Sequence, residues 1–565
     1  MGGFAILPKN CSYKKSIFNS FEKREFNTPI QFKNLNFDIL YYPKFNGVKQ
    51  YVTDKDENVL FVYGSLWYND IAFENSKDIL LDKIITNTLN EELLTGTFTL
   101  VFFNEQKDGI KILHDANAVN RFYFDGTSKI ISSSWLSLVW LEKRTKEQIN
   151  YNAIAENLIL GFNIGKKTFI NSIERIKLND NLPKNIEYTR LRCLIEKSIK
   201  TRDLSKSIRT SIKKLQNTLN PKLKSYNKIS LGISGGHDSR LLLGTIDKNI
   251  LGNKLSFFTF YKPKDKDLEI AKIIAHELKK KIEIIKTNEI DTQNDLENIY
   301  YRAFLFFDGQ CGTLLQYSKN DYTKKFRDKL LDKTDLHLSG VGGEIFRNYN
   351  HQPRIPLSWE FWIDQFLFGG NLKSCLNKKE VIENIKKEIR IDLGVNSEKI
   401  NFEDRKKFYG NIFLSDWHGI RNSIENQYAN YYSPFTDINL INYSYQTIRF
   451  HGSGGEYESE MINKASPELA KIKSGYGYNF SHIPLKFKII NKIRCLVKLP
   501  SFASIRKIKT VNKKDVDLSQ FEYGVFHDFK KNFNDKDINF DLLLNKKKDH
   551  MLMVSYALNT LIKQV

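Results

Sequence analysis

The chain has 565 residues, of which 41% are hydrophobic and 13% aromatic. Since a compact domain takes about 100 to 200 residues, this length predicts two or more domains, and the composition excludes a largely disordered chain. The formal net charge is +22 at pH 7, from 87 Lys and Arg against 65 Asp and Glu. This charge favours anionic partners, but the lysines are spread along the chain, and a drift of composition toward Lys and Asn explains the charge equally well.

The cysteines and the apolar runs set the expected compartment. The five cysteines lie far apart and form no CxxC pair, so neither a disulfide framework nor a zinc site is predicted. No window approaches about 18 uninterrupted apolar residues, and the N-terminus has no basic segment before a long apolar one. We therefore expect a cytoplasmic protein without a transmembrane segment.

In the first third of the chain, short apolar and aromatic runs alternate with turns, which predicts strands. The run 102–113 has the turn residues Lys-Asp-Gly between two apolar halves and predicts a hairpin. Helices are expected over 78–93 and 150–160. The polar and basic stretch from 177 to about 205 has no clear core pattern and is interpreted as a linker.

Beyond residue 205, segments with helical spacing alternate with short buried strands. The expected elements are helix 207–219, strand 228–233, helix 238–246, strand 254–261, helix 267–281 and strand 282–286. This alternation is typical of a doubly wound parallel sheet. Residues from about 290 to 480 are expected to be mostly helical.

One loop between the second and third of these elements, SGGHDS, has the composition of an anion-binding site. Gly235 and Gly236 let backbone N–H groups converge, and the following helix points its positive end at the loop. The loop lacks the lysine of a Walker loop, and Asp238 beside a phosphate makes sense only through Mg²⁺. The loop therefore predicts a magnesium-bound pyrophosphate, hydrogen-bonded by Ser234 and Ser239, and cleavage between the α and β phosphates of ATP. A plain turn with a helix cap is the alternative.

SGGxDS between a buried strand and a helix resembles the signature of the PP-loop ATP pyrophosphatases, which include the asparagine synthetases. Three further stretches are similar to asparagine synthetases: HLSGVGGEIFRNY (337–349), the segment 421–441 with its SPFTD, and PELAKIKSGYGYN (467–479). The first of them resembles the family's Ser-Gly-Glu-Gly-Ser-Asp-Glu-hydrophobic-Phe-Gly-Gly-Tyr. The resemblance covers most of 205–480 and implies ATP and Mg²⁺ as cofactors.

The resemblance also implies a role for each matching residue. Ser339 and Gly340 would lie against the AMP portion of ATP, and Glu344 would join Asp238 in binding magnesium and pyrophosphate. Lys473 would neutralise the phosphates during adenylation and amide formation. Catalysis is thus assigned to Lys473, Asp238 and Glu344, magnesium binding to Asp238 and Glu344, and nucleotide binding to Ser234, Gly235, Gly236, Asp238, Ser239, Ser339 and Gly340.

Residues 91–140 resemble the glutaminase domain that precedes the synthetase in this family. That domain uses a cysteine at position 2, whose own α-amino group is the base, and this chain has Gly2. Residues 63–65, Tyr-Gly-Ser, replace the family's Asn-Gly-Glu, and Thr95 replaces an Asp. We therefore expect no hydrolysis of glutamine, a structural or docking role for this domain, and ammonia or another amine as the nitrogen source.

The expected fold class is α/β together with α+β, in three parts. Residues 1–185 form a degenerate Ntn-type αββα sandwich, residues 205–480 a doubly wound PP-loop domain with helical additions, and residues 481–565 a basic extension packed on it. Within the extension, segment 486–514 holds no acid and has apolar residues at helical spacing opposite its lysines. This segment predicts either a docking surface for an acidic peptide, RNA or a membrane, or a solvated helix.

Some residues depart from the family pattern or stand outside it. Val341 stands where asparagine-forming members have Glu, and one acid of the following pair is missing, so aspartate is not implied as the substrate. Arg240 is expected either to touch phosphate or to form a surface pair. The glycine-rich segment 450–460 is expected to be a loop or helix cap, because no buried strand precedes it.

The sequence thus predicts an ATP-dependent ligase that adenylates a carboxylate, releases pyrophosphate and lets an amine attack the acyl-AMP. Expected partners are a small-molecule or peptide acid, an amine donor and an acidic peptide; nucleic acid is disfavoured and homodimer formation stays open. Within the enzyme class, the alternative is an asparagine synthase that uses free ammonia, and relatives without the cysteine include β-lactam synthetases and lasso-peptide cyclases. A non-catalytic relative that binds nucleotide or a partner is the alternative from another class.

Overall fold

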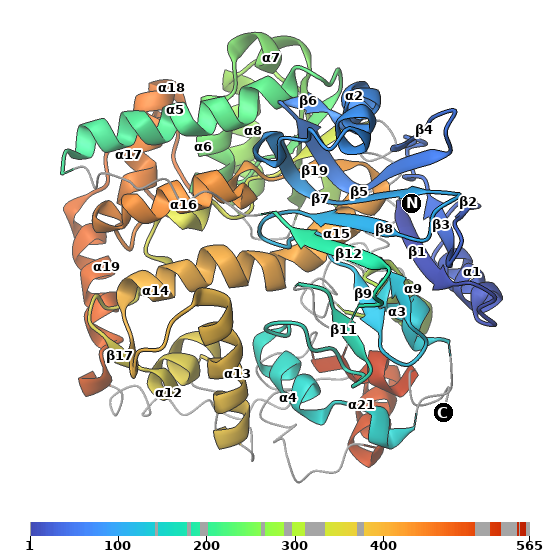
Figure 1. Ribbon diagram of the computed structural model, residues 1–565. Coiled ribbons are helices and arrows are strands. Elements are labelled where there is room, and N and C mark those ends of the chain that lie inside the picture. Colours follow the sequence, from blue (N-terminus) through green and yellow to red (C-terminus); the bar gives the residue numbers. More distant parts are fainter. Residues whose placement is uncertain are drawn as a thin grey trace.

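The computed structural model describes residues 2–141, 145–177, 182–191, 202–261, 266–286, 296–310, 334–369, 378–502, 520–532, 551–552 and 554–560. It is a mixed α/β structure whose sheets include both parallel and antiparallel strand pairs (Figure 1). None of the helices in this part of the chain combines the length and the apolar character that crossing a membrane requires.

The first 190 residues contribute two mainly antiparallel sheets. The first has the order β11 (Ile173–Arg175), β9 (Tyr123–Asp125), β10 (Ile130–Ser132), β1 (Gly3–Pro8), β3 (Phe37–Tyr42) and β2 (Ile30–Lys33). The second has the order β12 (Ile186–Arg190), β8 (Ile110–His114), β7 (Leu94–Asn104), β5 (Asn58–Tyr68) and β4 (Tyr51–Thr53), and β6 (Ile71–Ala72) pairs with β5.

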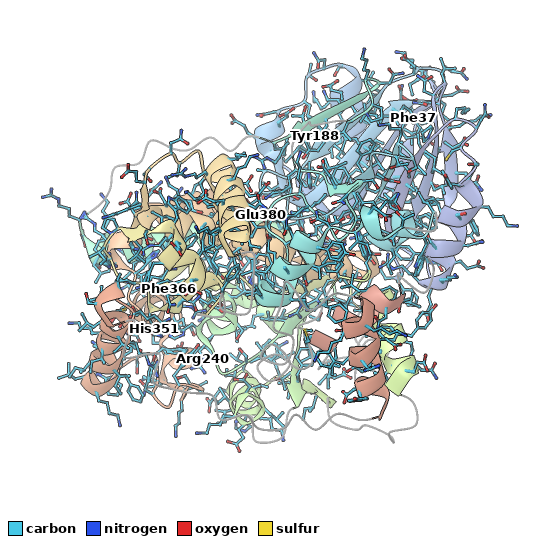
Figure 2. All side chains as sticks on the ribbon, turned by 90° about the horizontal axis from the view of Figure 1, so that it is seen from below. Phe37, Tyr188, Arg240, His351, Phe366 and Glu380 are labelled. Atoms are coloured by element: carbon cyan, nitrogen blue, oxygen red, sulfur yellow. The ribbon has the colours of Figure 1, made fainter. Side chains whose placement is uncertain are left out.

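These two sheets pack face to face, with helices on their outer faces. Phe61 of β5 and Ile39 of β3 belong to the core between the sheets, whereas Leu60 of β5 faces the core under helix α2 (Phe73–Ile85). This alternation follows from the two-residue period of a strand. Helix α1 (Lys14–Lys23) lies on the other outer face, where Phe21 stacks on Tyr42 at 4.1 Å. Figure 2 labels Phe37 and Tyr188 in the core between the sheets, on the side of the molecule opposite Arg240.

The predicted hairpin is confirmed, and the predicted linker is partly wrong. Strands β7 and β8 pair antiparallel around the turn at 104–110. The expected helix 150–160 corresponds to α4 (Tyr151–Leu160), while helix α2 ends earlier than expected, at Ile85. Within the stretch expected to be a linker, β12 pairs parallel with β8, and Ile186 and Tyr188 enter the sandwich core. Strand β12 alternates apolar and polar residues, but the charged residues around it obscure this short pattern in the sequence.

The third sheet is entirely parallel, and its strands up to residue 286 follow the predicted alternation. Its two later strands lie in the region that was expected to be mostly helical. Its order is β15 (Ile282–Lys286), β14 (Leu255–Tyr261), β13 (Ile229–Gly232), β16 (Leu336–Leu338) and β19 (Asn430–Tyr432). Helix α5 (Leu204–Leu223) precedes the first of these strands in sequence, and helices α6 (His237–Thr245), α7 (Lys248–Asn253) and α8 (Asp267–Glu277) lie between β13, β14 and β15. Phe257 and Phe258 of β14 enter different core clusters, so both faces of the sheet are covered.

The rest of the described chain is mostly helical, as predicted. Its helices are α9 (Leu296–Phe306), α12 (Trp359–Trp362), α13 (Lys378–Leu393), α14 (Phe402–Lys407), α15 (Gly419–Tyr428), α16 (Ile438–Gln446), α17 (Glu456–Ala465), α18 (Pro467–Lys471), α19 (Leu485–Val497) and α21 (Gln520–Asn532). Helix α19 covers the start of the acid-free segment, and most of its apolar side chains are exposed, Leu485 at 71%. The remainder of that segment, 503–514, lies outside the described residues.

A buried carboxylate joins the N-terminal sandwich to the helical region. Asp416 contacts Arg175 at 2.5 Å and Lys177 at 3.2 Å, and accepts a hydrogen bond from the Gly165 N–H at 2.9 Å. Burial alone would raise the pKa of Asp416, but Lys177 and Arg175 hold that pKa below its ordinary value. The carboxylate is therefore ionised at neutral pH and neutralises two cations of the sandwich.

Asp416→Ala should lower the free energy of unfolding by about 3 to 5 kcal/mol, because two largely buried cations lose their partner. Urea unfolding followed by tryptophan fluorescence measures this change. Asp392→Ala is the matched control: Asp392 contacts Lys177 at 2.6 Å, but its side chain is 14% exposed, so its loss should cost less. Equal losses in the two variants would contradict the role given to Asp416.

Candidate functional site

The candidate site begins at the loop between strand β13 and helix α6, at the carboxyl end of the central strand of the parallel sheet. The Gly235 N–H donates to the Asp267 carboxylate at 2.8 Å, and the Gly235 carbonyl accepts from the Gly475 N–H at 3.0 Å. A Cβ on Gly235 would lie 2.8 Å from Asp267 Oδ1 and 3.0 Å from the Gly475 nitrogen. Gly235 is therefore glycine because two other segments approach its backbone closely.

The two serines of this loop lie side by side. Ser234 Oγ is 3.1 Å from Ser239 Oγ, and the Ser234 N–H donates to Ser239 Oγ at 3.2 Å. The Gly236 N–H donates weakly to Ser234 Oγ at 3.3 Å, and Gly236 is the residue before helix α6. Two rotatable hydroxyls thus stand at the positive end of a helix, which suits an anion.

The end of the neighbouring strand β16 packs directly on this loop. A Cβ on Gly340 would lie 2.9 Å from the Ser239 nitrogen and 3.0 Å from the Asp238 carbonyl carbon. The Ser339 N–H donates to the Tyr432 carbonyl at 2.9 Å, which continues the sheet toward β19. The structure therefore brings together all the residues that the sequence assigned to nucleotide binding.

A cavity of about 250 Å³ opens between these two strand ends. Its walls come from the β13 loop, from the end of β14, from residues 337–342 and from the helical region. The lining residues include Ser234, Asp238, Ser239, Phe258, Phe260, Ser339, Gly340, Glu344, His418 and Arg421. Ligands of parallel α/β sheets bind at this carboxyl edge, so the cavity is in the expected place for a small molecule.

Asp238 and Glu344 meet at an arginine. Arg347 Nη2 lies 2.9 and 3.0 Å from the two Asp238 oxygens and 3.1 Å from Glu344 Oε1. Arg347 Nη1 lies 3.2 Å from Glu458 Oε2, on helix α17. Gly343 makes room for this group, because a Cβ there would lie 2.3 Å from Asp238 Oδ1. We call Asp238, Glu344, Glu458 and Arg347 the acid–arginine cluster.

Burial and mutual repulsion set the protonation of this cluster. Burial raises the pKa of Glu458 well above its ordinary value, and the negative charge of Asp238 adds to the rise against the opposing effect of Arg347. Burial and this repulsion thus favour the protonated form of Glu458. Burial and the charge of Glu344 raise the pKa of Asp238 to about 6, although Arg347 opposes them. Burial would also raise the pKa of Glu344, but Arg347 holds it below its ordinary value.

This arrangement does not fit a magnesium ion between Asp238 and Glu344. Mg²⁺ requires a near-octahedral shell of oxygens, most of them from water and carboxylates. Both carboxylates that the sequence assigned to Mg²⁺ are bound to the Arg347 guanidinium instead. Within the described ranges, no group of three or more His, Cys, Asp or Glu is arranged to hold a metal ion.

Lys473 lies on a loop beside the β13 loop, and its side chain is exposed. The carbonyls of Ile472 and Lys473 accept hydrogen bonds from Arg240 at 2.7 and 3.3 Å. Arg240 is fully buried, and its guanidinium lies 4.6 Å from the Phe480 ring. The sequence predicted that Arg240 either touches phosphate or forms a surface pair, and both predictions are wrong because the side chain is fully buried. Arg240 instead connects the Lys473 loop to helix α6.

Sequence reasoning does not single out Arg347 or Glu458. The sequence could have pointed to Arg347, because residues 347–348, Arg-Asn, stand where the stretch it resembles in asparagine synthetases has Gly-Gly. Glu458 lies in segment 450–460, which forms a loop leading into helix α17, as predicted. No protein-family profile matches the chain, and no curated protein matches it either.

At the N-terminus, Gly2 is buried against helix α15. Its N–H donates to the Gln427 carbonyl, and a Cβ on Gly2 would lie 3.0 Å from Lys44 Cγ. The Lys44 ammonium donates to the Gly64 carbonyl at 2.7 Å and to Asn430 Oδ1 at 2.6 Å. The segment 63–65, where the resemblance places glutamine-holding residues, is thus packed against residues that follow α15.

Gly340→Ala should lower the free energy of unfolding by about 1 to 3 kcal/mol, because the new methyl group meets backbone atoms that cannot rotate away. Chemical denaturation monitored by circular dichroism measures the loss. Gly252→Ala in helix α7 is the control: nothing lies within 4 Å of a Cβ at Gly252, so stability should stay or rise by up to about 1 kcal/mol. A tolerated Gly340→Ala would mean that the two strand ends are not in close contact.

Proposed function

We propose that the protein is an ATP-dependent, AMP-forming carboxylate–amine ligase of the asparagine synthetase-like kind, with a PP-loop domain behind an Ntn-type sandwich that does not hydrolyse glutamine. The observation that carries the proposal is the junction of two strand ends at one cavity. The glycine-serine loop after β13 and the Ser339-Gly340 turn after β16 enclose it together. Such a junction suits pyrophosphate on one side and an AMP portion on the other.

The chain's own residues suit the chemistry of adenylation. A carboxylate oxygen would attack the α-phosphorus, the bond to the β-phosphate oxygen would break, and pyrophosphate would leave with the bonding electrons. Ser234, Ser239 and the first amides of helix α6 would hydrogen-bond the departing charge. Lys473 has a flexible exposed side chain next to the loop, from which it could approach the phosphates.

A second cavity of about 460 Å³ is the proposed place for the acid substrate. It shares Glu344 with the first cavity and borders the acid–arginine cluster through Arg347. Tyr476, Tyr478 and Phe487 give it aromatic walls, and Arg494 gives it a cation outside the acid–arginine cluster. These groups suit a carboxylate that carries an apolar portion, either a small molecule or a peptide.

The amine would complete the reaction in this second cavity. Its nitrogen would attack the acyl carbon, the bond to the AMP oxygen would break, and the nitrogen would lose a proton. Ammonia, an amine on the same substrate and an amine from another protein all remain compatible with the proposal, because Gly2 offers no nucleophile for releasing ammonia from glutamine.

A non-catalytic relative that binds nucleotide is the second candidate. Val341 and the guanidinium between Asp238 and Glu344 favour it, because both change groups that the resemblance assigns to chemistry. The two candidates differ in turnover and agree in nucleotide binding. Calorimetric binding of ATP without any release of pyrophosphate would support the non-catalytic relative.

Adenylation is tested by the exchange of labelled pyrophosphate into ATP, which needs the acid but no amine. With purified protein, ATP and fractions of an extract that contains small acids and peptides, we expect exchange that depends on one fraction. Ser239→Ala should slow the exchange by about 100-fold, since one donor to the departing charge is lost. Ser256→Ala is the control, because its hydroxyl binds the Ile229 carbonyl at the start of β13 and β14, away from the cavity.

An oxygen label identifies the reaction further. If the active acid carries ¹⁸O in its carboxylate, one labelled oxygen should appear in AMP once the amine is added. Exchange that is absent with every fraction, while ATP still binds, would rule out the ligase. Label that stays entirely in the acid would rule out an acyl-AMP intermediate.

A further inference from the structure

In the acid–arginine cluster, the Arg347 guanidinium is the cation that contacts the acids. Its three carboxylates come from helix α6, from the turn after β16 and from helix α17, and all three contact one guanidinium at 2.9 to 3.2 Å. The Glu458 side chain is fully buried, and that of Arg347 is 13% exposed. Asp238 and Glu344 give this guanidinium charge-assisted contacts, so it is a strongly bound cation.

Neighbouring groups hold the guanidinium in place. The Lys406 ammonium donates to the carbonyls of Glu344 and Ile345 at 3.2 Å each, and also to the Arg347 carbonyl. Tyr409 Oη donates to Glu344 Oε2 at 2.8 Å, while Glu344 Oε1 contacts Arg347. Both carboxylate oxygens of Glu344 therefore have a partner. Moving Arg347 away would leave the partly buried Asp238 carboxylate without its cation, which is costly.

A divalent ion would need the same oxygens. Both oxygens of Asp238 and one of Glu344 face Arg347, and a second cation beside it would meet the repulsion of a positive charge in a poorly solvated place. In the similar stretch of asparagine synthetases the residue after Phe is Gly, whereas here Arg347 follows Phe346. This stretch therefore has one acid fewer than the similar stretch, and it has an arginine at a glycine position.

We propose that Arg347 is the resident cation of the cluster, and that the protein binds nucleotide with no divalent ion on Asp238 or Glu344. The statement about nucleotide rests on the proposed function, while the statement about the metal does not. The guanidinium supplies one fixed positive charge at the junction of the two cavities, and this charge cannot be removed by a chelator.

The metal statement is tested with Mn²⁺ alone, by electron paramagnetic resonance of the free ion in the presence of the full chain. We expect the wild-type protein and the Glu344→Gln variant to bind the same amount of Mn²⁺, because no ion sits on Glu344 in the wild type. Arg347→Gly should create a site for one Mn²⁺ per chain, and adding Glu344→Gln to that variant should abolish it. Mn²⁺ bound by the wild type and lost in Glu344→Gln would overturn the proposal.

Two further variants control for charge and folding. Arg449→Ala removes one exposed positive charge outside the cluster and should behave as the wild type. Arg347→Lys keeps a cation and should also bind no Mn²⁺, so Mn²⁺ binding by that folded variant would overturn the proposal. Circular dichroism verifies the fold of each variant, and if Arg347→Gly does not fold, the comparison of wild type, Glu344→Gln and Arg347→Lys decides.

The nucleotide statement is tested by calorimetric titration of ATP with and without a chelator. We expect the dissociation constant to change by less than about threefold, whereas a loss of tenfold or more on chelation would overturn the statement. If ATP does not bind under either condition, the proposed function fails, and the Mn²⁺ measurements still decide whether Arg347 is the cation of the cluster.

Discussion

The contact between the Arg347 guanidinium and three carboxylates is the constraint on which the candidate site depends. It joins carboxylates of helix α6, the turn after β16 and helix α17, each of which lies more than a hundred residues from the next in sequence. The positive charge of Arg347 offsets the repulsion between the Asp238 and Glu344 carboxylates in a poorly solvated place. The close approach permitted at Gly340 and Gly343 brings the turn to the helix.

The N-terminal sandwich helps to position the candidate site through its contacts with the two ends of helix α15. Asp416, near the end of the π-helix Phe408–His418 that leads into α15, neutralises Arg175 and Lys177 of the sandwich, and Gly2 donates to the Gln427 carbonyl at the other end of α15. Helix α15 is followed by β19, whose Tyr432 pairs with Ser339 beside the cavity. The contacts that hold the sandwich therefore also position one wall of the candidate site.

Much of the fold could be predicted because its helices and strands follow from the spacing of apolar residues within short segments. The strand-helix alternation from β13 to β15 and the hairpin of β7 and β8 follow from apolar periodicity and turn residues. Strand β12 could not be predicted in this way, since its few apolar residues are surrounded by charge and only the pairing with β8 makes it a strand. For Arg240, the sequence showed a cation next to the loop, but its burial against Phe480 depends on segments more than two hundred residues away.

The sequence by itself determined the glycine-serine loop and its place between a buried strand and a helix, because apolar periodicity and glycine spacing are local patterns. It also determined that position 2 carries no nucleophile. Only the tertiary structure decided which cation faces Asp238 and Glu344. That choice depends on distances between segments remote in sequence, and a charge on a chain says nothing of its partner until folding brings the two within a few ångströms.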